Sequence, residues 1–196
     1  WYPFEKDSEV LEIGAGMGAI TGALCEKAGN VTVVELSKQR ATSIAKRNEK
    51  AMLAKGAYEV GASHYKYMIL LHTSFFISFL VEVAFIKSSF TPYYAFLAIF
   101  IVLQLLRVWC LASLGTFWNT KIIILPGANV VVKGPYAFIR HPNYLIVCLE
   151  IAVLPLMFQA YVTAILFTIL NIIMLSVRIP REEKALKEAT DYAKVI

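Results

Sequence analysis

Long apolar runs, broken by short polar stretches, make up most of the C-terminal two thirds of the chain. The runs at 67–86 and 93–114 each have the length of a helix that crosses a membrane, which takes about 20 residues. The runs at 144–158 and 160–177 follow each other closely, and the first of them is short for a full span. We therefore predict a helical bundle of about four membrane spans, arranged as two hairpins.

The polar segments beside these runs have patterns of their own. Residues 115–143 contain two β-branched runs, IIIL and VVV, separated by PGAN, which is typical of a β-hairpin. We expect this hairpin at the membrane interface. Residues 178–196 predict an amphipathic C-terminal helix outside the membrane.

Elements typical of soluble proteins precede the first span. Residues 9–14 and 31–36 predict two short strands, and residues 19–28 and 37–56 predict the helices that follow them. The order β-α-β-α is half of a doubly wound, Rossmann-like sheet. The predicted fold class is therefore mainly α, an integral membrane helical bundle preceded by a truncated α/β segment.

Composition agrees with a membrane location, since 58% of the residues are hydrophobic and only 17% are charged. The net charge of +5 does not indicate nucleic-acid binding, because the basic residues flank the apolar runs, where they act as topology signals. Residues 38–66, 115–143 and 178–187 carry most of them, so we expect these segments on the cytosolic side. No metal site or disulfide framework is predicted, because the cysteines are scattered at Cys25, Cys110 and Cys148.

A glycine-rich stretch, VLEIGAGMGAITG at 10–22, follows the first predicted strand. Glycines let a backbone approach a cofactor closely, and an acidic residue at the end of the next strand can bind ribose hydroxyls. The stretch resembles the first two motifs of class I S-adenosylmethionine-dependent methyltransferases, over residues 1–47. The resemblance implies a cofactor site at Glu12, Gly14, Gly16, Gly18 and Glu35.

The later strands of such a domain do not follow, because the chain continues into membrane spans. Two strands and two helices leave a half-covered sheet with open edges, which rarely stands alone. We therefore expect a vestigial second site without turnover. The alternative is that this loop is the working site and that the spans only anchor it.

Two dense groups of polar residues lie beside the last two apolar runs. The first, KGPYAFIRHPNY at 133–144, offers hydrogen-bond donors, acceptors and a fixed positive charge within a short segment. The second, RIPREEKAL at 178–186, places carboxylates at the end of the last run. An arginine can bind a carboxylate through two hydrogen bonds, and carboxylates can bind an ammonium group or ribose hydroxyls. We predict that the two groups enclose one cofactor.

Together these stretches resemble the isoprenylcysteine carboxyl methyltransferase family, especially its bacterial members, over residues 48–196. The resemblance rests on KGPYAFIRHPNY, on Glu150 in the following run, and on RIPREEKAL with EATDYA after it. It implies an integral membrane methyltransferase, expected in a bacterial plasma membrane, with S-adenosylmethionine in a cytosol-facing pocket and a lipophilic acceptor that arrives from the bilayer. The chain then looks like a chimera with its seam near residues 45–50.

Roles within the two groups follow from the chemistry of methyl transfer. A methyl sulfonium is already electrophilic, so alignment supplies most of the rate. Arg140, His141 and Glu183 are predicted to be catalytic, with Arg140 orienting an anionic group. The predicted cofactor-binding residues are Lys133, Gly134, Tyr136, Arg140, His141, Asn143, Tyr144, Arg178, Glu182 and Glu183.

Ionisable residues inside the apolar runs are costly unless they are neutral, paired or face a cavity. Glu150 is expected to pair with Arg107 or His72, either as a structural contact or along a substrate tunnel. His72 and Glu82 are expected to make polar contacts between helices.

The acceptor stays open between a prenylcysteine carboxylate, a fatty acid and the hydroxyl of a lipid or polyketide. Partners are expected among lipophilic small molecules, lipidated acceptors and membrane lipid, and not among nucleic acids. The sequence predicts no oligomeric state. Two alternative functions remain: a nicotinamide-dependent membrane reductase of related architecture, and an inactive truncated fusion.

Overall fold

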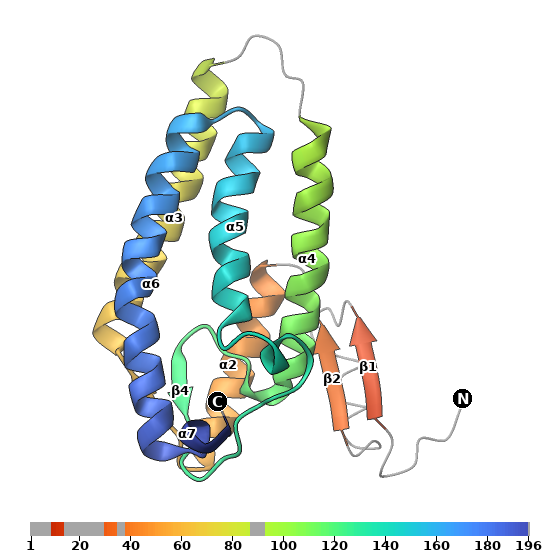
Figure 1. The fold of residues 1–196 in the computed structure, drawn as a ribbon, viewed down its shortest axis with the longest axis vertical. Helices are drawn as coiled ribbons and strands as arrows, with labels where there is room; N and C mark the ends of the chain where they lie inside the picture. The colour runs from red at the N-terminus through yellow and green to blue at the C-terminus, as the bar shows by residue number, and fades with distance from the viewer. Residues whose placement is uncertain (1–8, 14–29, 35–37, 87–92, 196) are drawn as a thin grey trace.

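The computed structural model describes residues 9–13, 30–34, 38–86 and 93–195. Figure 1 shows long helices that run side by side, with the shorter elements gathered at one end. The helices are α2 (Lys38–Ala54), α3 (Ala62–Ile86), α4 (Tyr94–Leu114), α5 (Pro142–Met157), α6 (Tyr161–Ala189) and α7 (Tyr192–Val195), with short 3-10 helices η1 (Gly115–Phe117) and η2 (Gly134–Ala137). The strands are β1 (Glu9–Ile13), β2 (Asn30–Val34), β3 (Tyr58–Val60) and β4 (Ile122–Ile124).

Three helices of the described chain, α3, α4 and α6, are long and apolar enough to cross a membrane. The fourth apolar helix, α5, has 16 residues. A helix suits a lipid environment because it satisfies every backbone hydrogen bond within the segment. The four apolar runs of the sequence therefore correspond to helices, and the expectation that the third is short is confirmed.

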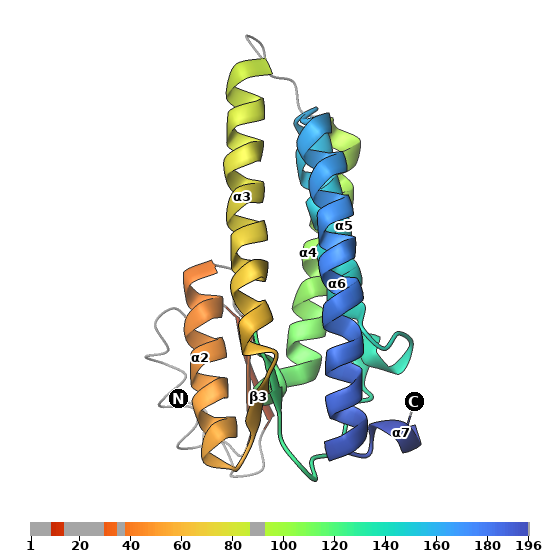
Figure 2. The same cartoon turned by 90° about the vertical axis from the view of Figure 1, so that its left-hand side faces the viewer.

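The four long helices pack in the spatial order α4, α5, α6, α3. α4 packs on α5, α5 on α6, and α6 on α3, and Figures 1 and 2 show them as neighbours along one axis. One apolar cluster joins α3, α5 and α6, and a second joins α4 to α5. The clusters are Leu71, Phe75, Ile151 and Phe167, and Leu103, Cys110, Ile146 and Val153.

The shorter elements lie at the end of the bundle where α4 ends and α5 begins (Figure 1). We call this end, formed by residues 38–61, 115–141 and 178–195, the polar end. It contains the three basic segments that the charge pattern predicts on one side of the membrane. At the polar end β3 pairs antiparallel with β4, from Tyr58 opposite Ile124 to Val60 opposite Ile122.

The predicted hairpin between IIIL and VVV is wrong. Ile122–Ile124 form β4, but their partner is β3, and residues 130–132 form no strand. The reason is burial, because all three isoleucines of β4 are buried between neighbouring elements. Ile123 packs with Met52 and Ala57, and the other two pack against Ala185 of α6. A local hairpin does not provide these contacts.

The predicted tail helix is confirmed over residues 178–189, but it is not a separate helix. The last apolar run and most of the charged tail form one helix, α6, which continues through Pro180 to Ala189. A proline inside a helix removes one backbone hydrogen bond and normally favours a break. Here Arg178 is buried just before the proline and holds the helix to its neighbours, so tertiary contacts override the local preference.

The N-terminal segment is described only in part. β1 and β2 pair in parallel, from Glu9 opposite Asn30 to Ile13 opposite Val34. Gly14, Gly16, Gly18 and Glu35 lie outside the described residues, as does the predicted helix at 19–28, and for Glu12 only the backbone is described. The α/β segment and its vestigial site therefore stay predictions.

Within the polar end, helix α2 packs on the segment that follows α4. Asn48 Nδ2 donates hydrogen bonds to the carbonyl oxygens of Gly115 (3.3 Å) and Trp118 (2.9 Å), and Met52 packs with Ile123. The predicted seam at 45–50 falls inside this helix. The domain boundary stays a prediction.

Glu82 of α3 binds the first turn of α6, which confirms the predicted polar contact between helices. Its carboxylate accepts hydrogen bonds from the backbone N–H groups of Val162 (3.0 Å) and Thr163 (2.7 Å), which have no partner inside their own helix. Glu82→Ala leaves these donors unpaired and is expected to lower the free energy of unfolding by about 1–3 kcal/mol. Thermal unfolding in detergent measures the loss.

The matched control for that prediction is Glu188→Ala. Glu188 is an exposed carboxylate of α6, the helix that Glu82 contacts. It is expected to leave the unfolding temperature unchanged. Equal unfolding temperatures for the two variants would contradict the proposed docking role of Glu82.

Candidate functional site

A cavity of about 850 Å³ lies between the four long helices and the polar end. Side chains from all four helices line it, together with parts of the segment 117–144. Polar side chains of the segments 140–144 and 178–182 line it at the polar end, and Phe75, Phe76 and Phe100 line it further into the bundle. A volume of this size is typical of a small-molecule site, for which pockets of roughly 300–1,000 Å³ are usual.

The cavity brings the two predicted polar groups together. One group comes from the segment that leads into α5, and the other comes from the last turns of α6. The predicted site residues that line the cavity are Tyr136, Arg140, His141, Asn143, Tyr144, Arg178 and Glu182. Glu183 lies outside the lining, but it contacts His141 directly.

Hydrogen bonds connect the two groups across this end of the cavity. The Tyr144 hydroxyl donates to a carboxylate oxygen of Glu182. Glu183 Oε1 lies 3.2 Å from His141 Nε2 and also accepts a hydrogen bond of 3.3 Å from the Tyr192 hydroxyl. The His141 ring stacks on Tyr144, with ring centroids 5.5 Å apart. Residues that are about forty positions apart in sequence thus form one hydrogen-bonded wall.

Arg178 is the most connected side chain of this wall. Its Nε donates to the Tyr144 hydroxyl (2.8 Å), its Nη2 to the carbonyl oxygen of Thr120 (2.9 Å), and its Nη1 to Met68 Sδ (3.1 Å). The sequence places Arg178 and Glu182 on one helix face, and both do line the cavity. The Tyr144 hydroxyl links them, because it bonds to both.

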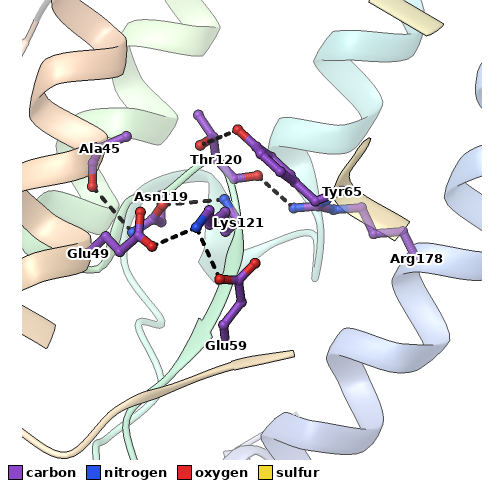
Figure 3. Close-up of polar contacts among 8 residues, drawn as sticks. All are labelled: Ala45, Glu49, Glu59, Tyr65, Asn119, Thr120, Lys121 and Arg178. Carbon is purple, nitrogen blue, oxygen red and sulfur yellow. Dashed lines mark hydrogen bonds and ion pairs between the residues drawn. The ribbon is translucent and has the colours of Figure 1, made fainter. Parts of the chain in front are cut away.

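A polar network outside the wall fixes the segment that carries Thr120 (Figure 3). Lys121 Nζ binds Glu49 Oε1 of α2 (2.7 Å) and Glu59 Oε2 of β3 (3.0 Å), and both hydrogen bonds raise the pKa of Lys121. The hydroxyls of Thr120 and Tyr65 lie 3.1 Å apart. These contacts hold Thr120 and Lys121, which line the cavity, against α2, β3 and α3.

Lys133 and Gly134 do not line the cavity, and their cofactor-binding role stays a prediction. Lys133 is exposed. Gly134 has φ +60°, and a Cβ at this position would overlap the Ser113 hydroxyl of α4. Close packing of η2 on α4 therefore requires a glycine at this position.

Charged side chains of both signs and neutral tyrosine hydroxyls line the cavity where it meets the polar end of the bundle. Arg140 and Arg178 are cations, and Glu182 is an anion that lines the same space. Burial raises the pKa of Tyr136 well above its usual range. Such a surface can bind a zwitterion, since it offers a partner for each of its charges.

Asn143 carries an unused acceptor. Its Oδ1 is buried and has no hydrogen-bond partner among the described residues. A buried polar atom without a partner costs stability, so its presence next to a cavity indicates a site for a ligand donor. The side chain belongs to the first turn of α5 and lines the cavity.

Of the two partners expected for Glu150, the structure shows Arg107. The Arg107 guanidinium pairs with both carboxylate oxygens of Glu150 inside the bundle. His72 Nδ1 instead lies 2.8 Å from the Met68 carbonyl oxygen of its own helix. The prediction of an Arg107–Glu150 pair is confirmed.

Sequence reasoning missed several residues of the site. The Thr120 carbonyl and Met68 are contacts of Arg178 that no sequence pattern marks, because they depend on how distant segments meet. Tyr192, in the EATDYA segment, donates to Glu183, a contact that the sequence does not predict. Gln104 also binds Glu150, and its position one helical turn before Arg107 in an apolar run is a signal that could have identified it.

The fold and the cavity together define a membrane protein that can hold a polar ligand at one end of a bundle and an apolar ligand inside it. The sequence pattern of the isoprenylcysteine carboxyl methyltransferase (ICMT) family matches residues 96–188. An "Uncharacterized protein YpbQ" of Bacillus subtilis (strain 168) is 42% identical over 159 residues, which cover 81% of this chain and 95% of that protein.

An "Uncharacterized protein" of Haemophilus influenzae Rd is 32% identical over 146 residues, or 74% of this chain and 85% of that protein. No solved structure gives a significant match. The chain belongs to the isoprenylcysteine carboxyl methyltransferase family. It is accordingly an integral membrane protein of a methyltransferase family.

Proposed function

We propose that this protein is an S-adenosylmethionine-dependent methyltransferase that methylates an oxygen of a lipophilic acceptor. The observation that carries the proposal is the unpaired Asn143 Oδ1 in a cavity shared by both polar groups. S-adenosylmethionine supplies an electrophilic methyl group when it is bound. The family is the reason to choose this cofactor among zwitterions.

The charged residues of the polar end are assigned to different groups of the cofactor according to their charge. Arg140 is assigned to a carboxylate, because it is a cation that lines the cavity. Glu182 is assigned to an ammonium group or ribose hydroxyls, and Glu183, which lies outside the lining, is assigned to orient His141. His141 and Tyr144 hold these carboxylates in place through the hydrogen bonds already described, and Asn143 Oδ1 accepts from a donor of the cofactor.

The membrane orientation is part of the proposal. The polar end faces the cytosol of a bacterial cell, supported by the basic residues of the segments that form it. The acceptor enters from the bilayer, supported by the apolar lining further inside the bundle. The acceptor is a prenylcysteine-like carboxylate, a fatty acid, or a lipid or polyketide hydroxyl.

The test is methyl transfer from labelled S-adenosylmethionine to a lipid extract by the purified protein, with identification of the product. The wild type is expected to label a lipid. Asn143→Ala is expected to weaken cofactor binding about tenfold without loss of thermal stability, because the lost oxygen has no partner in the protein. Arg140→Ala is expected to reduce methyl transfer about 100-fold by removing a charged contact.

Asn48→Ala and Arg181→Ala are the matched controls. Asn48 is hydrogen-bonded outside the cavity, so its loss is expected to lower stability and leave cofactor affinity unchanged. Arg181 is exposed, and its loss is expected to change neither. A wild-type protein that labels no lipid, or an Arg140→Ala variant with full transfer, would contradict the proposal.

A further inference from the structure

A second polar cluster lies deeper in the bundle than the residues assigned to the cofactor. Arg107 Nε donates to Glu150 Oε1 (2.7 Å), Gln104 Nε2 donates to the same oxygen (2.8 Å), and Arg107 Nη2 pairs with Glu150 Oε2. We call Gln104, Arg107 and Glu150 the deep cluster. All three residues line the cavity.

The depth of the cluster makes it costly to maintain. Arg107 lies seven residues before the end of α4 at Leu114, and Glu150 lies eight residues after the start of α5 at Pro142. At 1.5 Å per residue, both are about 10–12 Å from the polar end. The hydrocarbon core of a bilayer is about 30 Å thick, so the pair lies where ionisable residues are rare and usually functional.

The cluster also has hydrogen-bonding capacity that the bundle does not use. Arg107 binds Glu150 through Nε and Nη2, and within the described part of the chain nothing accepts from Nη1. The two side chains remain 29% and 15% exposed, although the helix faces around them are apolar. A contact that served only to join α4 to α5 would not need to face the cavity.

The cavity wall beyond the deep cluster is apolar on three helices. Phe76 of α3, Phe100 of α4 and Leu154 of α5 all line the cavity. Each lies one helical turn further from the polar end than a polar cavity residue of its own helix, namely His72, Gln104 and Glu150. Along its length the cavity therefore offers the cofactor-assigned residues, then the deep cluster, then an apolar wall.

We propose that the deep cluster is the binding site for the acceptor's head group. Arg107 hydrogen-bonds the ionised oxygen that is to be methylated, Glu150 and Gln104 are positioning residues that orient Arg107, and the acceptor's tail lies against Phe76 and Phe100. The inference rests on the proposed methyl transfer. Glu150 and Tyr144 are six residues apart, about 9 Å along α5, so the two sites are neighbours in one cavity.

The proposed step balances without a base. An oxygen that binds in its ionised form makes the new oxygen–carbon bond with its own electron pair. The methyl–sulfur bond breaks and leaves its electrons on sulfur, so no proton has to be removed during transfer. The charge of Arg107 fits this requirement, because a guanidinium stabilises an oxygen anion in a site that excludes water.

The test uses a double variant, Arg107→Met with Glu150→Leu, because removal of one partner alone leaves a charge unpaired in the membrane. Replacing both partners by apolar groups is expected to preserve the fold and the affinity for S-adenosylmethionine. The kcat/KM for the lipid acceptor is expected to fall about 30-fold, mainly through KM. An unchanged kcat/KM would show that the pair only joins two helices.

A binding measurement separates this inference from the proposed function. Decanoate is expected to bind the wild type about tenfold more tightly than the double variant, whereas decanol is expected to bind both equally. Equal decanoate affinities, or no decanoate binding to the wild type, would overturn the inference. Tighter decanoate binding by a wild type that transfers no methyl group would instead support the deep site and contradict the proposed function.

Discussion

Replacing Arg178 with alanine is expected to lower the free energy of unfolding by about 3–5 kcal/mol, because it breaks a buried polar network. Arg178 is 5% exposed and binds Tyr144, the Thr120 carbonyl and Met68. Its loss disconnects α6 from α3, from α5 and from the segment before β4. It also leaves the Tyr144–Glu182 pair without its cation. For a chain of this length the unfolding temperature is expected to fall by about 10 °C.

Two further variants define what Arg178 contributes. Arg178→Lys keeps the charge but cannot make three hydrogen bonds in a fixed plane, so it is expected to recover less than half of the lost stability. Arg181→Ala removes an exposed arginine from the next turn of the same helix and is expected to have no effect. If Arg178→Ala unfolded at the wild-type temperature in detergent, the buried network would not stabilise the fold.

Replacing Glu183 with alanine is expected to reduce the kcat/KM for methyl transfer about 100-fold, which corresponds to about 2.7 kcal/mol of lost transition-state stabilisation. Glu183 Oε1 contacts His141 and Tyr192, and Oε2 lies 3.7 Å from Lys187 Nζ. The variant therefore removes the carboxylate that orients His141 next to the cavity. Its side chain is 21% exposed, so the loss of stability is expected to be small.

The comparison of Glu183→Gln with Glu183→Ala isolates the role of charge. The amide can keep a hydrogen bond to the Tyr192 hydroxyl but does not provide a negative charge, so an activity close to that of the alanine variant is expected. Glu188→Gln changes an exposed carboxylate of the same helix and is expected to retain full activity. Wild-type kinetics for Glu183→Ala, measured with labelled cofactor, would remove Glu183 from the proposed site.

Burial and the charge of Arg140 shift the pKa of Tyr192 in opposite directions. Burial and the nearby Glu183 carboxylate raise its pKa, and Arg140 lowers it, with burial the largest effect. The phenol therefore stays protonated at neutral pH and remains a donor to Glu183. This is consistent with a wall that keeps its hydrogen bonds across the physiological range.

The apolar runs predicted the long helices because a membrane span is a local property. About 20 apolar residues in succession are sufficient to mark one, whatever the rest of the chain does. The shortness of α5 and the start of α2 near Ser37 also followed from local patterns. The Arg107–Glu150 pair could be expected because an ionisable residue in an apolar run needs a partner.

The hairpin, and the start of the tail as a separate helix, were predicted wrongly because local preference did not decide them. β4 pairs with β3, which lies more than sixty residues earlier in the chain, because this arrangement buries its isoleucines. α6 continues through Pro180 because the contacts of Arg178 outweigh the lost hydrogen bond. Lys133 and Gly134 belong to the same motif as the cavity residues, but close packing on α4 explains the glycine.

The sequence by itself determined the membrane bundle, its family and the two polar groups, because hydrophobic length and short motifs are contained in contiguous residues. Only the tertiary structure decided that the two groups share one cavity, that Tyr144 links Arg178 to Glu182, and that Asn143 Oδ1 has no protein partner. It also decided that the deep cluster faces the same space. These features depend on distances between side chains of different helices, which are set when the bundle packs.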